Sequence, residues 1–219
     1  MVDPALFADV ELLADLSADE LERLAGAATL RPLQRGDVLF GEGDEPTTLF
    51  VVVSGRIAIA NKSFDRRESV VALMEPGDLF GEMGMFDGPG RSAEARSLEG
   101  SEVVVIPYGP LREIYEQRPS LLWGVVRLLA GRLRSADLAL ADSVFLDVTG
   151  RTAKRLLELG GDDDVFALPI TQEELAGMVG ASRERVNKAI ASFIRLGWIE
   201  QHERRYRITN RVELTKRAR

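Results

Sequence analysis

Residues 119–147 read PSLLWGVVRLLAGRLRSADLALADSVFLD, and the rest of the chain is organised around this stretch. Strand-like patterns precede it and short helical patterns follow it. Pro119 suits the first turn of a helix, where its missing N–H costs no hydrogen bond, and the next proline is Pro169. The stretch therefore predicts one long helix.

A narrow apolar seam follows this predicted helix, because its members recur at alternating spacings of four and three residues. The seam consists of Leu122, Val126, Leu129, Leu133, Ala136, Leu140 and Ser143. Arginine and aspartate side chains between these positions leave little apolar surface on the other sides. We interpret the seam as the interface of paired helices in a two-fold homodimer, and a stripe of a monomer's own core is the alternative.

The composition limits the classes of protein that remain open. A chain of 219 residues can form two compact domains joined by a helix. It has no cysteine, which excludes disulfides, thiolate metal sites, iron–sulfur clusters and cysteine nucleophiles. Acidic residues interrupt the first 16 positions, and no run of about 18 apolar residues occurs. We therefore expect a cytoplasmic protein that has no membrane segment.

Charge is divided unevenly along the chain. Residues 1–149 carry a net charge of −11 and residues 150–219 carry +4, within a total of −7. A basic final third on an acidic protein indicates that nucleic acid binds at that end.

Residues 31–107 have the pattern of an antiparallel barrel. The clearest predicted strands are 38–40, 49–53, 57–60, 69–74 and 102–106, and turns that contain glycine separate them. Such spacing favours a jelly roll or a similar barrel. Short packing helices are expected before it, one of them opened by a capping box from Ser17 to Glu20.

The single histidine narrows the chemistry of this barrel. A metalloenzyme barrel of the cupin type holds its metal largely through histidines, but His202 lies far outside residues 31–107. The same count argues against a Ser-His-Asp site and against haem held by histidine in the barrel. A metal-dependent barrel enzyme is therefore not expected.

One segment of the barrel, FGEMGMFDGPGRSA at residues 80–93, is too rich in glycine for a plain strand. It resembles the phosphate-binding cassette of cyclic-nucleotide-binding domains. A cyclic phosphate buried there needs a charged donor, which Arg91 can supply beside the Ser92 hydroxyl. Glu82 then accepts a hydrogen bond from the ribose 2′-hydroxyl, and Gly81 lets the backbone come close to the nucleotide. Met83 is the remaining candidate ligand-binding residue of this segment. The alternative is an ordinary surface loop with an Arg–Glu pair.

The C-terminal third has the pattern of a helix-turn-helix. Thr171 begins a capping box for a helix that ends at Val179, and Gly180 breaks it. Ser182 is the expected N-cap of a second helix over about 183–196. Small and apolar residues stand where two crossing helices must touch. A two-stranded wing is expected over residues 198–209.

Taken together, nearly the whole chain resembles the superfamily of the cyclic AMP receptor protein and the fumarate–nitrate regulator, within it the cyclic AMP receptor branch. Residues 145–151, FLDVTGR, match the family's hinge. The resemblance implies that Arg132 pairs with Glu82 near the ribose. It also implies that three residues read DNA bases: Arg183 contacts a guanine, Glu184 accepts from a cytosine amino group and Lys188 contacts a second guanine. Candidate phosphate contacts are Ser182, His202, Arg204 and Arg205.

The sequence departs from the family at the two positions that are expected to contact the nucleotide base. The family carries a pair of hydroxyl or amide side chains on the long helix for adenine, and Ala136 and Asp137 occupy those positions here. The Asp137 carboxylate can accept from the adenine amino group, or from two N–H groups of guanine. Cyclic AMP is therefore the first expectation, cyclic GMP the second and no nucleotide the third.

These observations predict an α+β chain with three parts. They are a cyclic-nucleotide-binding β-roll over 1–118, a dimerisation helix over 119–147 and a winged helix-turn-helix over 148–219. The expected function is a homodimeric transcription regulator on a two-fold symmetric double-stranded DNA operator, with RNA polymerase as a further partner and no metal, haem or iron–sulfur cluster. One rival is the same architecture without a small-molecule effector, and the other is a barrel enzyme with an appended interaction domain.

Overall fold

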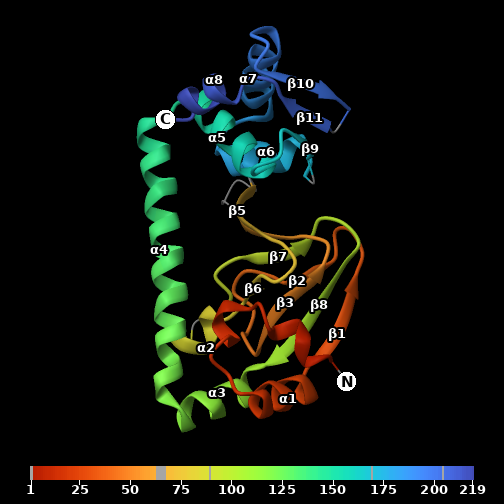
Figure 1. The fold of residues 1–219 in the computed structure, drawn as a ribbon, viewed down its shortest axis with the longest axis vertical. Coiled ribbons are helices and arrows are strands. Elements are labelled where there is room, and N and C mark those ends of the chain that lie inside the picture. The colour runs from red at the N-terminus through yellow and green to blue at the C-terminus, as the bar shows by residue number, and fades with distance from the viewer. Residues whose placement is uncertain (1, 63–67, 89, 169, 204) are drawn as a thin grey trace. The chain divides into compact units, whose positions relative to one another are not determined.

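The computed structural model describes residues 2–62, 68–88, 90–168, 170–203 and 205–219. The chain divides into two compact units, one formed by residues 1–61 and 71–134 and the other by residues 62–70 and 135–219. Figure 1 shows the elements of both units along the chain.

The first unit is a barrel of two four-stranded sheets with the strand orders β1-β8-β3-β6 and β2-β7-β4-β5. The strands are β1 Thr29–Leu33, β2 Val38–Phe40, β3 Thr48–Ser54, β4 Ile57–Lys62, β5 Glu68–Met74, β6 Leu79–Phe80, β7 Glu94–Ser97 and β8 Ser101–Pro107. The long pairing of β3 with β8 is antiparallel, as are the pairings of β8 with β1 and of β4 with β7. The predicted antiparallel β-roll is confirmed.

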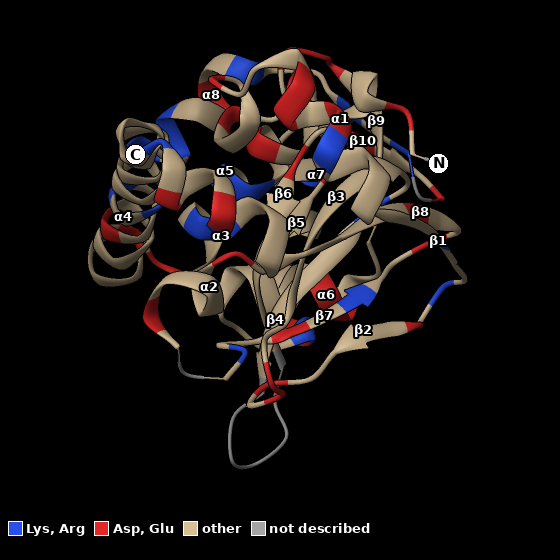
Figure 2. Ribbon diagram, turned by 90° about the horizontal axis from the view of Figure 1, so that it is seen from below, with Lys and Arg blue, Asp and Glu red and all other residues tan. Residues whose placement is uncertain are grey.

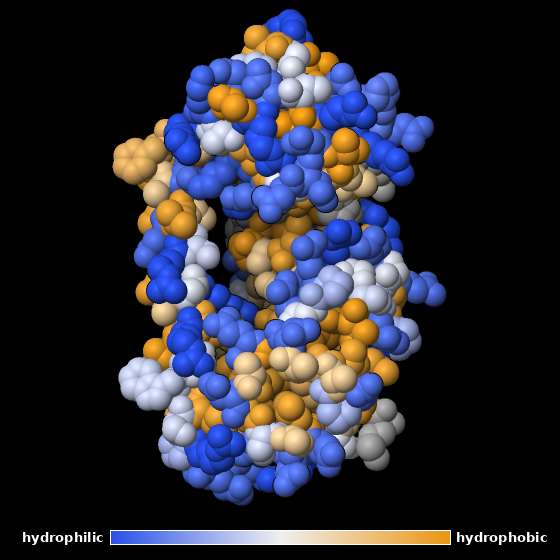
Figure 3. All heavy atoms as spheres, viewed as in Figure 1, coloured by the Kyte–Doolittle hydropathy of each residue, from blue (hydrophilic) through white to orange (hydrophobic). Residues whose placement is uncertain are grey.

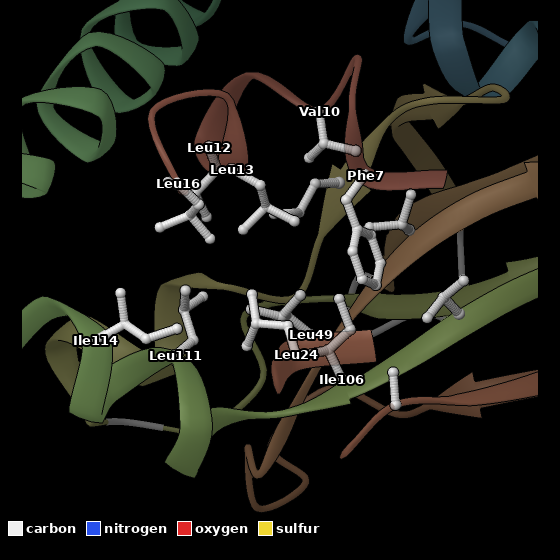
Figure 4. Packing of buried hydrophobic residues seen from close by; sticks show 14 of the residues in the cluster. Phe7, Val10, Leu12, Leu13, Leu16, Leu24, Leu49, Ile106, Leu111 and Ile114 are labelled. Atoms are coloured by element: carbon white, nitrogen blue, oxygen red, sulfur yellow. The ribbon is translucent and has the colours of Figure 1, made fainter. Parts of the chain in front are cut away.

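Strand β3 is buried on both faces because its side chains alternate between two clusters. Leu49 and Val51 pack with the N-terminal segment and with helices, whereas Phe50 and Val52 pack inside the barrel between the sheets. Figure 4 shows Leu49 beside Ile106 and Leu24 in the first of these clusters. The barrel therefore has an apolar interior and an apolar outer face under a helical cover.

Short helices form that cover. They are η1 Pro4–Phe7, η2 Glu11–Leu13, α1 Ala18–Ala27, α2 Met83–Asp87 and α3 Tyr108–Gln117. The predicted capping box of α1 is present, with both of its reciprocal bonds between Ser17 and Glu20. Figure 2 shows basic and acidic residues on both α1 and α3, and Arg23 of α1 lies 3.4 Å from Glu113 of α3.

The long predicted helix is present with shorter bounds. Residues Pro119–Leu121 form a 3₁₀ turn, η3, and the α-helix α4 runs over Leu122–Phe145. On one side of α4 Val125 is buried in the cluster that contains α3, and Leu128 packs against that cluster. The predicted seam faces away from this cluster and is exposed, and Figure 3 shows apolar side chains among hydrophilic ones along α4.

The second unit contains the predicted helix-turn-helix and wing. Its elements are α5 Val148–Gly160, β9 Val165–Ala167, α6 Gln172–Val179, α7 Arg183–Arg195, β10 Ile199–His202, β11 Arg205–Ile208 and α8 Arg211–Arg217. The wing differs from the prediction because β9 adds a third strand, in the order β10-β11-β9. Phe166 of β9 stacks on Tyr206 of β11 with ring centroids 5.9 Å apart, which anchors the added strand.

The C-terminal residues form a capped helix, α8. Asn210 caps α8 by accepting from the Glu213 N–H at 3.1 Å, and Leu214 is fully buried. Arg217 bonds to both carboxylate oxygens of Asp147, the N-cap of α5. Helix α8 is therefore tied to the segment that joins α4 to α5.

Candidate functional site

The glycine-rich segment follows β6 and begins with a residue that must be glycine. Gly81 has φ +80°, a conformation that other residues rarely adopt. A Cβ placed there would lie 2.8 Å from Nη1 of Arg91. Glu82 then stands at the N-cap position of α2, and Arg91 lies in the loop between α2 and β7. The loop thus brings Arg91 against the backbone of Gly81.

Arg91 is buried, with 7% of its surface exposed. Its Nη1 donates to the Gly81 carbonyl at 2.6 Å and to the Tyr108 hydroxyl at 3.1 Å. Its Nη2 donates to the Thr48 carbonyl at 2.6 Å and to Thr48 Oγ1 at 3.3 Å. Every one of these acceptors is neutral.

Aromatic rings surround the guanidinium. Its Cζ lies 4.2 Å from the centroid of the Phe40 ring, 5.6 Å from that of Phe50 and 5.9 Å from that of Tyr108. Cation–π attraction partly offsets the loss of hydration. Burial lowers the pKa of Arg91, but a guanidinium stays protonated in proteins. The site therefore carries a buried positive charge.

Glu82 is the second buried charged group of the site, with no exposed surface. Its Oε1 accepts from Nη1 of Arg132 on α4, and Nη2 of Arg132 donates to the Leu79 carbonyl at 2.9 Å. Burial raises the pKa of Glu82, and Arg132 opposes that rise. The pairing of Arg132 with Glu82, which the family resemblance implied, is present in the structure.

One polar atom on each of these residues lacks a partner. Within the described part of the chain, Arg91 Nε and Glu82 Oε2 are buried without a hydrogen bond. A buried group without a partner costs free energy, so such atoms point to a ligand. A ligand that carries both an anion and a hydroxyl group would satisfy the charged donor and the carboxylate acceptor. A cyclic phosphate ester of ribose has both groups, so the residues fit it.

The remaining predicted ligand residues fall into two groups. Ser92 and Met83 lie together, with Ser92 Oγ 3.9 Å from Met83 Sδ, and both side chains are exposed. Ala136 and Asp137 are exposed on α4 in the part of the helix that belongs to the second unit, and Ala136 is one turn beyond Arg132.

Several residues that contact Arg91 were not predicted from the sequence, and three of them lie at or next to the end of a strand. They are Phe40 at the end of β2, Thr48 at the start of β3 and Tyr108 after β8. Each lies at the end of a strand and looks in the sequence like ordinary barrel structure. No motif marked them, because the strand pairing brings them to Arg91.

The candidate DNA-reading surface lies at the start of α7. Gly180 ends α6 with φ +67°, and Ser182 caps α7 by accepting from the Arg185 N–H. Arg183, Glu184 and Lys188 are all exposed. Glu184 and Lys188 form an ion pair at 2.7 Å with both side chains 75% exposed, and this pair lowers the pKa of Glu184.

The wing carries the remaining predicted DNA contacts. His202 and Arg205 are exposed and face each other in register across β10 and β11. Arg204 lies outside the described residues. Both described side chains are therefore accessible at the tip of the hairpin.

The barrel with its buried Arg91–Glu82 site and the winged helix-turn-helix define a class, that of DNA-binding regulators controlled by a cyclic nucleotide. Comparison with known families agrees. A family model described as "Cyclic nucleotide-binding domain" matches residues 30–118, and one described as "Crp-like helix-turn-helix domain" matches residues 150–217. The chain belongs to the superfamily of the cyclic AMP receptor protein and the fumarate–nitrate regulator. It is a transcription regulator and not an enzyme.

Individual relatives span most of the chain. A "CRP-like cAMP-activated global transcriptional regulator" of Mycobacterium tuberculosis is 38% identical over 91% of this chain and 94% of its own length. The "cAMP-activated global transcriptional regulator Vfr" of Pseudomonas aeruginosa is 33% identical over 82% of this chain and 88% of its own.

Solved structures show the same architecture. The catabolite activator protein of Thermus thermophilus is 28% identical, with a TM-score of 0.54 over 95% of this chain and 98% of its own. The global regulator CLP of Xanthomonas campestris, described as responsive to c-di-GMP, is 25% identical, with a TM-score of 0.75 over 88% of this chain and 99% of its own.

None of the helices among the described residues has both the length and the apolar character needed to span a membrane. Among the same residues, no group of three or more histidines, cysteines, aspartates and glutamates could hold a metal ion.

Proposed function

We propose that this chain is a cytoplasmic homodimeric transcription regulator, that cyclic AMP is its effector, and that it acts together with RNA polymerase on double-stranded DNA. The nucleotide binds better to the DNA-competent state and so raises its population. In that state the two recognition helices enter successive major grooves of a two-fold symmetric operator, about 34 Å apart. We retain the three-part division at residues 118/119 and 147/148.

One observation carries the effector assignment, namely the two buried atoms without partners in the 80–93 segment. Arg91 Nε–H is the donor for the phosphate, and Glu82 Oε2 is the acceptor for the ribose 2′-hydroxyl. Ser92 and Met83 lie at the exposed side of this site, and Gly81 leaves room for the backbone to approach.

The identity of the base is a separate question. Two relatives that are 38% and 33% identical are described as cAMP-activated, which supports cyclic AMP. Cyclic GMP is the alternative, because the Asp137 carboxylate can accept from both N1–H and N2–H₂ of guanine whereas Ala136 offers no hydrogen bond.

The seam of α4 supports the homodimer. Leu133 and Leu140 are 63% and 65% exposed, although they belong to a row of apolar residues at coiled-coil spacing. Pairing with the α4 of a second copy would remove this row from water.

The exposed start of α7 supports the DNA contacts. Arg183 binds guanine through its two-pronged guanidinium, while Glu184 accepts from cytosine and Lys188 contacts a second guanine. The Glu184–Lys188 ion pair has to open for both residues to read bases, and at this exposure it costs little to break. Ser182, His202, Arg204 and Arg205 contact phosphates and set the register.

Titration calorimetry of the full chain with cyclic AMP, cyclic GMP and c-di-GMP tests the effector, and DNA binding is then measured with and without the nucleotide that binds. Arg91→Ala is expected to abolish nucleotide binding while the fold is retained. Arg31→Ala, at an exposed arginine of β1, is the control and should bind normally. Full affinity in Arg91→Ala would contradict the phosphate assignment, and binding of none of the three nucleotides would leave a regulator without this effector.

A further inference from the structure

The guanidinium of Arg91 donates through three nitrogens, and the fold engages two of them. Nη1 donates to Gly81 and Tyr108, and Nη2 donates to Thr48. Only Nε is left, and its N–H is buried without a partner in the described structure. We propose that Arg91 presents this single donor to the ligand anion and that Thr48 and Tyr108 are positioning residues that fix its direction. The proposal rests on the proposed function.

Tyr108 holds one edge of the guanidinium in a defined orientation. Its hydroxyl donates to the Gly81 carbonyl, so its hydrogen is directed at that oxygen and a lone pair is left to accept from Nη1. The Gly81 carbonyl also accepts directly from Nη1 at 2.6 Å. Arginine, tyrosine and carbonyl thus form a closed triangle of hydrogen bonds, in which none of the three can turn without breaking two bonds.

Thr48 holds the other edge and is itself tied to Tyr108 through the backbone. Thr48 is paired with Pro107 at the end of β8, and the Tyr108 N–H donates to the Thr47 carbonyl at 3.0 Å. The two positioning residues therefore lie at the same end of a strand pair, Thr48 at the start of β3 and Tyr108 directly after β8. Phe40 lies 4.2 Å from the guanidinium carbon and limits its movement out of the plane.

A single fixed donor has a consequence for the phosphate. A cyclic phosphate has two exocyclic oxygens, and a guanidinium that is free to engage through two nitrogens can adapt to either or to both. One fixed Nε–H contacts one of them. Replacing that particular oxygen by sulfur, a weak acceptor, should weaken binding, while replacing the other should have less effect.

The test uses the two diastereomers of the cyclic AMP phosphorothioate, Rp and Sp, and compares their dissociation constants for the full chain. Loss of one charge-assisted hydrogen bond corresponds to about tenfold or more in affinity, so we expect the wild-type chain to prefer one diastereomer by about tenfold. In Tyr108→Phe and Thr48→Val the guanidinium gains freedom, and the preference should fall to within about threefold.

Two conservative variants serve as controls. Thr48→Ser retains the Oγ acceptor and should restore the wild-type preference. Tyr115→Phe makes the same chemical change at another buried tyrosine. The Tyr115 hydroxyl donates to the Leu12 carbonyl at 3.4 Å and not to the Arg91 site, so this variant should leave the preference unchanged.

Each outcome decides between roles. Equal binding of both diastereomers to the wild-type chain overturns the single-donor proposal. If Tyr108→Phe and Thr48→Val weaken both diastereomers by the same factor and keep their ratio, these residues are merely structural and the positioning role is overturned. If unmodified cyclic AMP and both analogues all fail to bind, the proposed effector is wrong and the inference falls with it.

Discussion

Glu82→Gln separates the functional role of the buried carboxylate from its role in the fold. The substitution keeps the shape of the side chain and an oxygen that can accept from Arg132, but it removes the charge. In the structure Oε1 is bonded to Arg132 and Oε2 is free, so the lost capacity is that of the ligand-facing oxygen.

The magnitude follows from the type of bond. A hydrogen bond to a charged acceptor contributes about 1.5–3 kcal/mol, so Glu82→Gln should weaken the binding of cyclic AMP by about 10- to 150-fold. Removing the 2′-hydroxyl from the ligand should weaken its binding to the wild-type chain by a similar factor. Because both changes remove the same bond, 2′-deoxy cyclic AMP should bind the Glu82→Gln chain about as well as cyclic AMP does.

Calorimetry of the two proteins with the two ligands gives all four affinities and their coupling free energy. A coupling close to the single-change effects supports a contact between Glu82 and the 2′-hydroxyl. Additive losses would refute the reasoning, because they would mean that the carboxylate and the hydroxyl act independently. Thermal unfolding of the unliganded variant shows whether the fold survives the change.

Three further predictions concern the second unit and the long helix. Arg183→Ala should cost about 1–3 kcal/mol at one base position in a binding-site selection experiment, and a uniform loss over all sequences would make it a phosphate contact. Asp147→Ala removes both the N-cap of α5 and the Arg217 ion pair, and should destabilise the unit by about 1–2 kcal/mol, whereas Asp147→Asn retains the cap and should cost less. The cap and Arg217 lower the pKa of Asp147 in the folded chain, so the stability that the carboxylate contributes is present at pH 7 and is lost progressively as the pH falls from about 4 through that lowered pKa. A stability difference between wild type and Asn that did not shrink between about pH 7 and pH 3 in urea unfolding would contradict this. Leu133→Asp should dissociate the proposed homodimer in analytical ultracentrifugation, and Leu138→Asp, equally exposed on α4 but outside the seam, should not. Equal effects of both would argue against pairing through the seam.

Local sequence signals located most of the elements correctly. Ser17, Thr171 and Ser182 each cap the helix that the pattern assigned to them. A cap is a bond between residues two or three positions apart, so it needs no knowledge of the rest of the fold. The clearest strands were predicted from another local signal, the turns that contain glycine between them.

Segments whose structure depends on distant partners were harder to predict. Strand β9 forms because Phe166 stacks on Tyr206, and α8 is held by the bond between Arg217 and Asp147, which lie 70 residues apart. The start of α4 was placed three residues early, because Pro119 fits a 3₁₀ turn as well as an α-helical one.

The sequence by itself determined the class of protein and the chemical types at the site, because an arginine, a carboxylate and glycines at fixed spacing lie within one short segment. Only the tertiary structure decided how those groups are presented. Antiparallel pairing of β3 with β8 brings Thr48 and Tyr108 to the guanidinium, and neutral acceptors then engage both of its terminal nitrogens and leave Nε without a partner. That arrangement depends on three-dimensional proximity between residues far apart in the chain, which no local pattern of residues encodes.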